Sequence, residues 1–112
     1  MTDKIVVLSA CASVKEANRI ATELVEKKLA ACVNLVSGVR SVYRWKNKIE
    51  KSQEVLLVIK TSRALFESVR SQIEKVHSYE IPEVIALPVV DGAEPYLEWM
   101  DRELVKDAEQ PE

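Results

Sequence analysis

The chain has 112 residues, 47% of them hydrophobic and 30% charged, with a formal net charge of −2. This length and composition predict a single globular domain over residues 1–112, with an ordered core over about 4–105 and a flexible tail over 106–112. The charge argues against nucleic acid as the main partner, because no basic excess neutralises phosphates. No apolar run approaches the ~20 residues that cross a bilayer, and no secretory segment is visible. We therefore expect a cytoplasmic protein with free cysteine thiols and no membrane partner.

A strand and a helix are predicted first. Residues 5–8 form a continuous apolar run, typical of a central strand, which continues through residues 9–11. Ser13 and Glu16 have the spacing of a capping box, in which the Ser13 hydroxyl accepts from the Glu16 amide and the Glu16 carboxylate reaches back. Apolar residues then recur at helical spacing and predict a helix that ends near residue 28: Ala17, Ile20, Ala21, Leu24 and Val25.

A long β-hairpin follows, and the rest of the chain is organised around it. Its strands are Val33–Trp45 and Ile49–Thr61, with Asn47 in the tight turn because asparagine tolerates positive φ. Gly38 predicts a bulge or bend in the first strand. Thirteen residues at about 3.3 Å each span roughly 40 Å, about twice the reach of the other strand candidates. The tip is therefore expected to protrude beyond the sheet.

The protruding hairpin exposes Tyr43 and Trp45 together with unpaired backbone groups along an edge. Either another copy of the chain pairs with this edge, or the hairpin stays solvated and is defended by its basic side chains: Arg40, Arg44, Lys46, Lys48 and Lys51. Aromatic residues on an otherwise bare hairpin favour pairing, so we expect an oligomer.

A second helix and a loop come after the hairpin. Thr61 or Ser62 is the predicted cap of the helix, which ends near residue 77. Its apolar face consists of residues three and four apart: Leu65, Phe66, Val69, Ile73 and Val76. Pro82 disfavours helical backbone for the residue before it, so residues 79–83 are expected to form a loop.

The last elements are a strand over residues 84–90 and a short helix. Pro88 lacks an amide donor and belongs at a sheet edge or bulge, whereas Pro95 suits a first helical turn. The order βαββαβ plus a terminal helix is that of a ferredoxin-like α+β fold with an antiparallel sheet. The first and third strands are apolar on both faces and belong in its centre. Two helices cover one face and the terminal helix is too short for the other, which again favours self-association.

Four segments of the chain resemble the CutA divalent-ion tolerance family. They are EKKLAACVN at 26–34, VYRWKNKIE at 42–50, IKT at 59–61 and HSYEIPEV at 77–84. The resemblance covers residue 4 to about residue 104, and it implies a ferredoxin-like homotrimer similar to the PII signalling proteins, with long hairpins that pair between subunits. It also implies a cytoplasmic, non-enzymatic protein that responds to and tolerates divalent metal ions, copper especially, and that uses no organic cofactor.

Three residues are candidates for holding that metal. His77 is the only histidine, and imidazole is the commonest metal ligand, although a lone histidine at a helix end is more often a satisfied polar group. Cys11 offers a thiolate suited to Cu(I). In metal-binding members of the family a cysteine can stand at the end of the first strand, at the position that aligns with Ser9, and the resemblance therefore makes Ser9 the third candidate. Cys32 is interpreted as a small buried hydrophobe, and no CxxC, HExxH or EF-hand pattern is present.

A second group of residues predicts an inter-subunit pocket with aromatic walls for a polar small molecule. Its members come from the hairpin, the loop and the last helix: Tyr43, Trp45, Lys60, Thr61, Tyr79, Glu83 and Trp99. A charge pair between Lys60 and Glu83 is the structural alternative. A PII-like sensor of a small molecule or anion would signal through this pocket to an unidentified protein partner. No nucleophile–base set and no glycine-rich phosphate loop is visible, so we expect no enzyme.

Overall fold

The computed structural model describes residues 1–106, and most of the predicted tail, residues 107–112, lies outside the described part. The elements follow the predicted order, with one additional 3-10 turn before the second helix. They are β1 (Lys4–Cys11), α1 (Val14–Glu26), β2 (Cys32–Trp45), β3 (Lys48–Ser62), η1 (Arg63–Leu65), α2 (Phe66–Val76), β4 (Ile85–Pro88) and α3 (Glu94–Glu103). The prediction of a ferredoxin-like α+β fold is confirmed.

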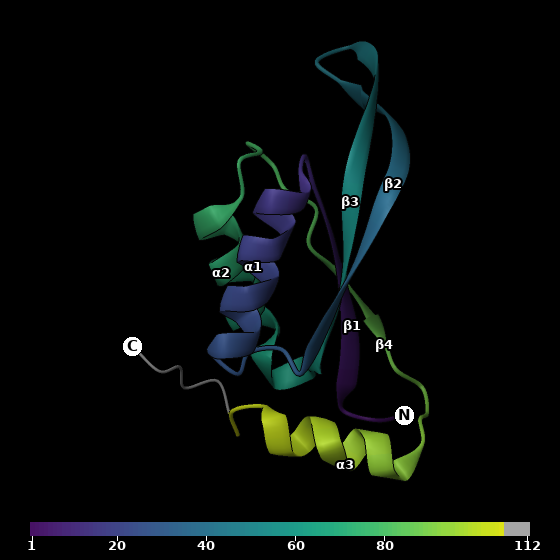
Figure 1. Cartoon of the computed structure of the whole chain (residues 1–112). Coiled ribbons are helices and arrows are strands. Elements are labelled where there is room, and N and C mark those ends of the chain that lie inside the picture. Colours follow the sequence, from purple (N-terminus) through teal and green to yellow (C-terminus); the bar gives the residue numbers. More distant parts are fainter. Residues whose placement is uncertain (107–112) are drawn as a thin grey trace.

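The four strands form one antiparallel sheet in the order β2-β3-β1-β4. Helices α1 and α2 pack side by side on one face of it, and α3 runs across its lower end (Figure 1). The two doubly apolar strands are central, as predicted, and Pro88 lies in an edge strand where its missing donor is tolerated. Strand β4 covers Ile85–Pro88 and is shorter at both ends than the predicted strand over 84–90, although the Val89 amide still donates to the Lys4 carbonyl at 3.1 Å.

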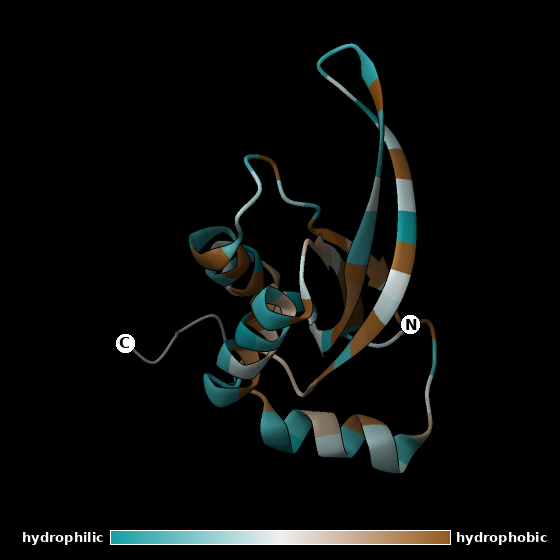
Figure 2. Cartoon of the chain, turned by 45° about the horizontal axis from the view of Figure 1, so that its top comes forward, coloured by the Kyte–Doolittle hydropathy of each residue, from teal (hydrophilic) through white to brown (hydrophobic). Residues whose placement is uncertain are grey.

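The β2–β3 hairpin projects from the sheet as an arm, which we define as residues 39–54 (Figure 1). Lys46 and Asn47 have φ angles of 51° and 67°, the conformation of a two-residue hairpin turn that matches the strand twist. Gly38 has φ 76°, and the register breaks between Val36 and Val39. The turn and the predicted bulge are therefore confirmed. The end of the arm is hydrophilic (Figure 2).

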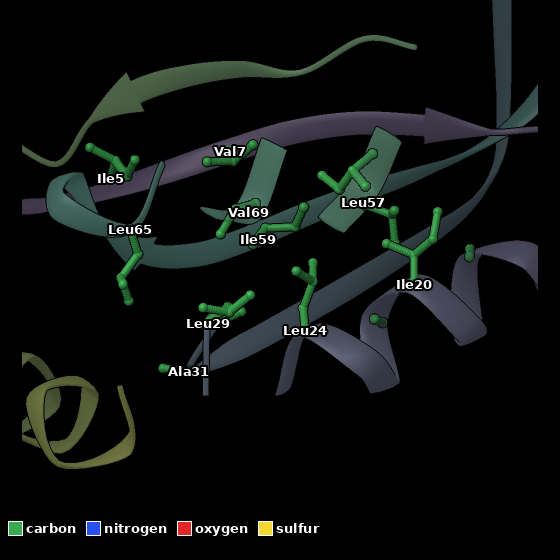
Figure 3. Close-up of a cluster of buried hydrophobic side chains, with 14 of the residues drawn as sticks. Ile5, Val7, Ile20, Leu24, Leu29, Ala31, Leu57, Ile59, Leu65 and Val69 are labelled. Atoms are coloured by element: carbon green, nitrogen blue, oxygen red, sulfur yellow. The ribbon is translucent and has the colours of Figure 1, made fainter. Parts of the chain in front are cut away.

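The hydrophobic core lies between the two long helices and the central strands (Figure 3). Val7 of β1 is opposite Ile59 of β3, so both side chains point to the same face of the sheet. They meet Leu24 of α1 and Val69 of α2, and all four side chains have no exposed surface. Each such burial contributes about 1.5–3 kcal/mol. The core thereby holds β1 and β3 rigidly beneath the base of the arm.

The starts of the two long helices differ in part from the prediction. The Ser13 hydroxyl accepts from the Glu16 amide at 3.1 Å, as expected for an N-cap. The Glu16 carboxylate does not reach back to complete a capping box, because it accepts instead from Ser78, 62 residues later in the chain. The predicted cap of the second helix is wrong as well. The chain passes through the turn η1 first, and α2 begins without a side-chain cap bond.

The sheet face opposite α1 and α2 carries a continuous apolar surface, which we call the open face. Cross-strand pairs bring Leu8 next to both Val58 and Ile85, and Val6 next to Leu87. Its members are half-buried or exposed: Val6, Leu8, Val36, Leu56, Val58, Ile85 and Leu87. Helix α3 covers only one end of this face, where its Asp101 pairs with Lys4 at 2.7 Å. Within residues 1–106, no helix is long and apolar enough to cross a membrane.

Candidate functional site

A cleft of about 630 Å³ lies between the arm and the loop of residues 77–83. The loop leaves α2 and rises beside the end of β1 toward the base of the arm (Figure 1). Three aromatic side chains line the cleft: Tyr43, Trp45 and Tyr79. Three carboxylates join them: Glu54, Glu80 and Glu83. The remaining lining residues are small or aliphatic: Ala10, Ser41, Val42, Ser78 and Ile81.

The bulge at Gly38 decides which arm residues face the cleft. Val36 is opposite Leu56 and Val39 is opposite Glu54, so β2 advances three residues where β3 advances two. One extra residue reverses the alternation of side chains on β2 relative to β3. Beyond the bulge, Tyr43 therefore shares a face with Glu54. Without the bulge, Arg40 and Arg44 of β2 would occupy that face and would offset most of the negative charge of the cleft carboxylates.

Glu54 and Tyr79 connect the two walls of the cleft. The Tyr79 hydroxyl donates to Oε2 of Glu54 at 2.7 Å, and Glu54 is only 9% exposed. Burial, together with this bond to the carboxylate, raises the pKa of the Tyr79 hydroxyl far above its ordinary value. The phenol is therefore a permanent donor at neutral pH. Among the ion pairs of residues 1–106, none involves Glu54.

His77 and Glu16 hold the loop in place. Nε2 of His77 lies 2.7 Å from the Ala10 carbonyl oxygen, which can only accept, so Nε2 carries the proton. The other ring nitrogen, Nδ1, then accepts from the Tyr79 amide at 3.1 Å. The Glu16 carboxylate accepts from the Ser78 amide at 2.5 Å and from its hydroxyl at 3.1 Å. These bonds tie the first two loop residues to β1 and α1.

The predicted metal ligands His77, Cys11 and Ser9 are all buried beneath the cleft end of β1. Both ring nitrogens of His77 are already hydrogen-bonded. Burial, with smaller contributions from Glu16 and Glu54, raises the pKa of the Cys11 thiol to about 12, which opposes the thiolate that a metal needs. The Ser9 hydroxyl is a buried oxygen that has no hydrogen-bond partner among the described residues. In this conformation the three residues do not form a ready metal site, and their role as ligands stays a prediction.

No cluster of three His, Cys, Asp or Glu side chains able to hold a metal ion occurs in the described part of the chain. A metal ligand set would therefore require a rearrangement of this structure or side chains from a second copy. The tight, closed geometry that transition metals demand is absent from residues 1–106.

Within one chain the predicted pocket residues divide into two groups. Four of the seven line the cleft: Tyr43, Trp45, Tyr79 and Glu83. The other three lie elsewhere. Lys60 stands over the Tyr96 ring at 5.8 Å, the Thr61 hydroxyl donates to the Leu29 carbonyl at 2.6 Å, and Trp99 packs against Tyr96. The alternative charge pair of Lys60 with Glu83 does not occur among the described ion pairs.

Seven lining residues were not predicted from the sequence, and Glu54 is the one among them that bonds across the cleft; the other six are Ala10, Ser41, Val42, Ser78, Glu80 and Ile81. Counting outward from the two-residue turn would have found Glu54, because Tyr43 pairs with Glu50 and the same count places Glu54 opposite Val39. The hydrogen bond between Glu54 and Tyr79 could not be predicted from the sequence pattern, because the two residues are 25 positions apart and belong to different elements.

The fold and the cleft define a class: a ferredoxin-like protein with a long β-arm and a polar, aromatic cleft at its base. A family model described as the CutA1 divalent ion tolerance protein matches residues 5–103. The chain belongs to this family, which is non-enzymatic. The resemblance noted from the sequence is thereby confirmed.

Individual relatives agree with this assignment. The chain is 50% identical over 90 residues to the human protein CutA, covering 80% of this chain and 50% of the relative. It is 42% identical over 95 residues to the divalent-cation tolerance protein CutA of Thermus thermophilus, covering 85% of this chain and 92% of the relative. The chain thus spans about half the length of its mouse and human relatives.

Two solved structures show the same fold. That of the Thermus thermophilus protein superimposes with a TM-score of 0.89 at 39% identity, covering 91% of this chain and 99% of the other. The Archaeoglobus fulgidus structure, described as a periplasmic divalent cation tolerance protein CutA, superimposes with a TM-score of 0.87 at 37% identity, covering 89% and 97%.

Proposed function

We propose that the chain acts in the cytoplasm as a homotrimeric divalent-cation tolerance protein that binds copper, and that assembly is a condition of metal binding. The open face is the observation that carries this proposal. Exposed apolar side chains there, such as Leu87 at 47% and Ile85 at 50%, form a contiguous patch of the kind that marks an interface. The projecting arm supplies a second edge for pairing between copies.

Family membership supports the connection to divalent cations. Because residues 1–106 of one chain contain no ready cluster of metal ligands, donors from two or three copies would have to combine, or His77 would have to leave one of its two hydrogen bonds. The first route, donors combined from several copies, makes the affinity for metal depend on the assembled form and is the one that we propose. The Archaeoglobus fulgidus relative is described as periplasmic, so cell fractionation is the test of the proposed cytoplasmic location.

Sedimentation velocity at micromolar concentration tests the assembly. The unaltered chain is expected as a trimer, and Leu87→Glu, which puts a charge on the open face, as a monomer. Val25→Glu is the matched control, since Val25 has similar exposure, 44%, on the helix side of the molecule. A species of 12.7 kDa for the unaltered chain would refute the assembly.

Calorimetric titration with Cu²⁺, Zn²⁺ and reduced copper tests the metal. The trimer is expected to bind copper more tightly than millimolar, and the Leu87→Glu monomer to bind it at least tenfold more weakly. His77→Gln and Cys11→Ala then report on the predicted ligands. Equal affinity in trimer and monomer would contradict the dependence on assembly.

A second candidate function is that of a small-molecule sensor, similar to the PII proteins, that signals to a protein partner. The cleft favours it, because aromatic walls with a few convergent polar groups are typical of ligand sites. A thermal-shift screen of metabolites against the unaltered chain and Tyr79→Phe would reveal a ligand. Absence of any ligand whose effect depends on Tyr79 would count against this candidate.

A further inference from the structure

We propose that the cleft binds a small organic cation, an amine or a guanidinium compound, with Glu54 as its counter-charge and Tyr43, Trp45 and Tyr79 as its walls. This inference rests on the second candidate function, the ligand-binding cleft, and names the chemical class of its ligand.

The charges that line the cleft all have one sign. Glu54, Glu80 and Glu83 contribute carboxylates, and none of the lining residues is Lys, Arg or His. The chain has 16 basic residues, so this asymmetry is a property of the cleft rather than of the protein. A cleft walled by one sign of charge concentrates ligands of the opposite sign and repels its own. An anion, which the PII resemblance suggested, is therefore disfavoured here.

Glu54 points to a missing cation most directly. Among the described residues, two of the types Lys, Arg, Asp and Glu are buried: Lys4, which is 3% exposed, and Glu54, which is 9% exposed. Lys4 is fully compensated, because it pairs with Asp3 and Asp101. Within residues 1–106, Glu54 receives one hydrogen bond, from a neutral phenol, and takes part in no ion pair. A buried carboxylate without a counter-charge is unfavourable, and a bound cation relieves this.

The aromatic walls select an organic cation. Faces of Trp and Tyr rings attract ammonium and guanidinium groups, and the chain itself shows this, since Nζ of Lys46 lies 5.8 Å from the Trp45 ring centroid. A divalent metal ion instead requires several converging donor atoms, and the residues that can be described contain no such cluster. A volume of about 630 Å³ is also far larger than a bare ion needs and lies in the range of small-molecule sites.

Spermidine and agmatine are suitable probes, carrying amines and a guanidinium group. In a Trp99→Phe background Trp45 is the only tryptophan, so its fluorescence reports on the cleft. At constant ionic strength we expect a saturable response at sub-millimolar concentration. Glu54→Gln, which keeps the oxygen that accepts from Tyr79 but removes the charge, should weaken the affinity at least tenfold. Glu98→Gln removes an equal charge from the exposed surface of α3 and should change nothing.

Calorimetry on the unaltered chain repeats the comparison without the Trp99→Phe change. Equal affinities of Glu54→Gln and Glu98→Gln would overturn the proposal, because binding would then reflect general charge attraction. Competition by Mg²⁺ at equal concentration would also overturn it, in favour of an unselective cation site.

Two further outcomes separate this proposal from the sensor function. A saturable response to ATP, with none to either amine, would refute the ligand class and leave the sensor candidate standing. No response to any probe, combined with a change in sedimentation of Glu54→Gln, would refute both, because a basic side chain of a second copy would then be the counter-charge.

Discussion

Oη of Tyr79 donates a hydrogen bond of 2.7 Å to Oε2 of Glu54, joining the loop after α2 to the base of the β-arm. The bond links elements that are remote in sequence and sets the width of the cleft between them. Because its acceptor is a mostly buried carboxylate, it belongs to the stronger, charge-assisted kind.

Tyr79→Phe removes this bond while preserving the ring. We expect a loss of about 1.5–3 kcal/mol in the free energy of unfolding, since the buried acceptor loses its donor. Urea denaturation measures the change. Tyr96→Phe is the control, because Tyr96 is 42% exposed and its hydroxyl makes no hydrogen bond within residues 1–106. Equal stability of the two variants would show that water replaces the phenol without loss.

His77→Gln disturbs the anchor of the loop. A glutamine side chain cannot donate to the Ala10 carbonyl and accept from the Tyr79 amide in the same geometry, so we expect a loss of about 2–3 kcal/mol. Hydrogen exchange should be faster at the Tyr79 amide, whose acceptor is removed. Ser78→Ala is a graded control, because it removes the hydroxyl bond to Glu16 but leaves the amide bond. Unchanged exchange at Tyr79 in His77→Gln would contradict the assigned tautomer.

The Cys11 thiol makes stability depend on alkaline pH. Burial, more than Glu16 and Glu54, raises its pKa from 9.0 to about 12 in the folded protein, so between these values the unfolded chain loses the proton first. The stability that the protonated Cys11 thiol contributes to the folded protein is complete below about pH 9 and is lost as the pH rises toward 12. We therefore expect the free energy of unfolding, measured with urea, to decrease less between pH 8 and pH 10.5 for Cys11→Ala than for the unaltered chain. Cys32→Ala is the matched control, and an equal decrease in all three would contradict the prediction.

Gly38→Ala tests the bulge. A Cβ at this position meets no atom within 4 Å, so the φ of 76° alone opposes the substitution. We expect a destabilisation of about 1–2 kcal/mol from the left-handed backbone. Ser37→Ala, the neighbouring exposed position, should be nearly neutral. Because the bulge also orients Tyr43 toward Glu54, nuclear Overhauser contacts between β2 and β3 beyond residue 39 report whether the register is kept. A shifted register would mean that the bulge, rather than the turn, aligns the arm.

Much of the fold was predictable because it depends on local patterns. Helical and strand periodicities, positive φ at Asn47 and Gly38, and the missing donor of Pro88 each constrain the backbone within a few residues. Four motif segments also sufficed to recognise the family. The cap of α2 was mispredicted because the chain inserts the turn η1, a choice that packing of Leu65 into the core explains better than any capping residue.

The sequence by itself determined the order of the elements, the central and edge strands, the protruding arm and the family. Only the tertiary structure decided which side chains meet: Glu54 with Tyr79, Glu16 with Ser78, and His77 with the carbonyl of Ala10. Periodicity predicts which face of its own element a residue occupies. Which side chains from different elements meet depends instead on the register at the bulge, the twist of the sheet and the path of the loop. Those are non-local properties, so the acidic, aromatic cleft emerged only when the chain was folded.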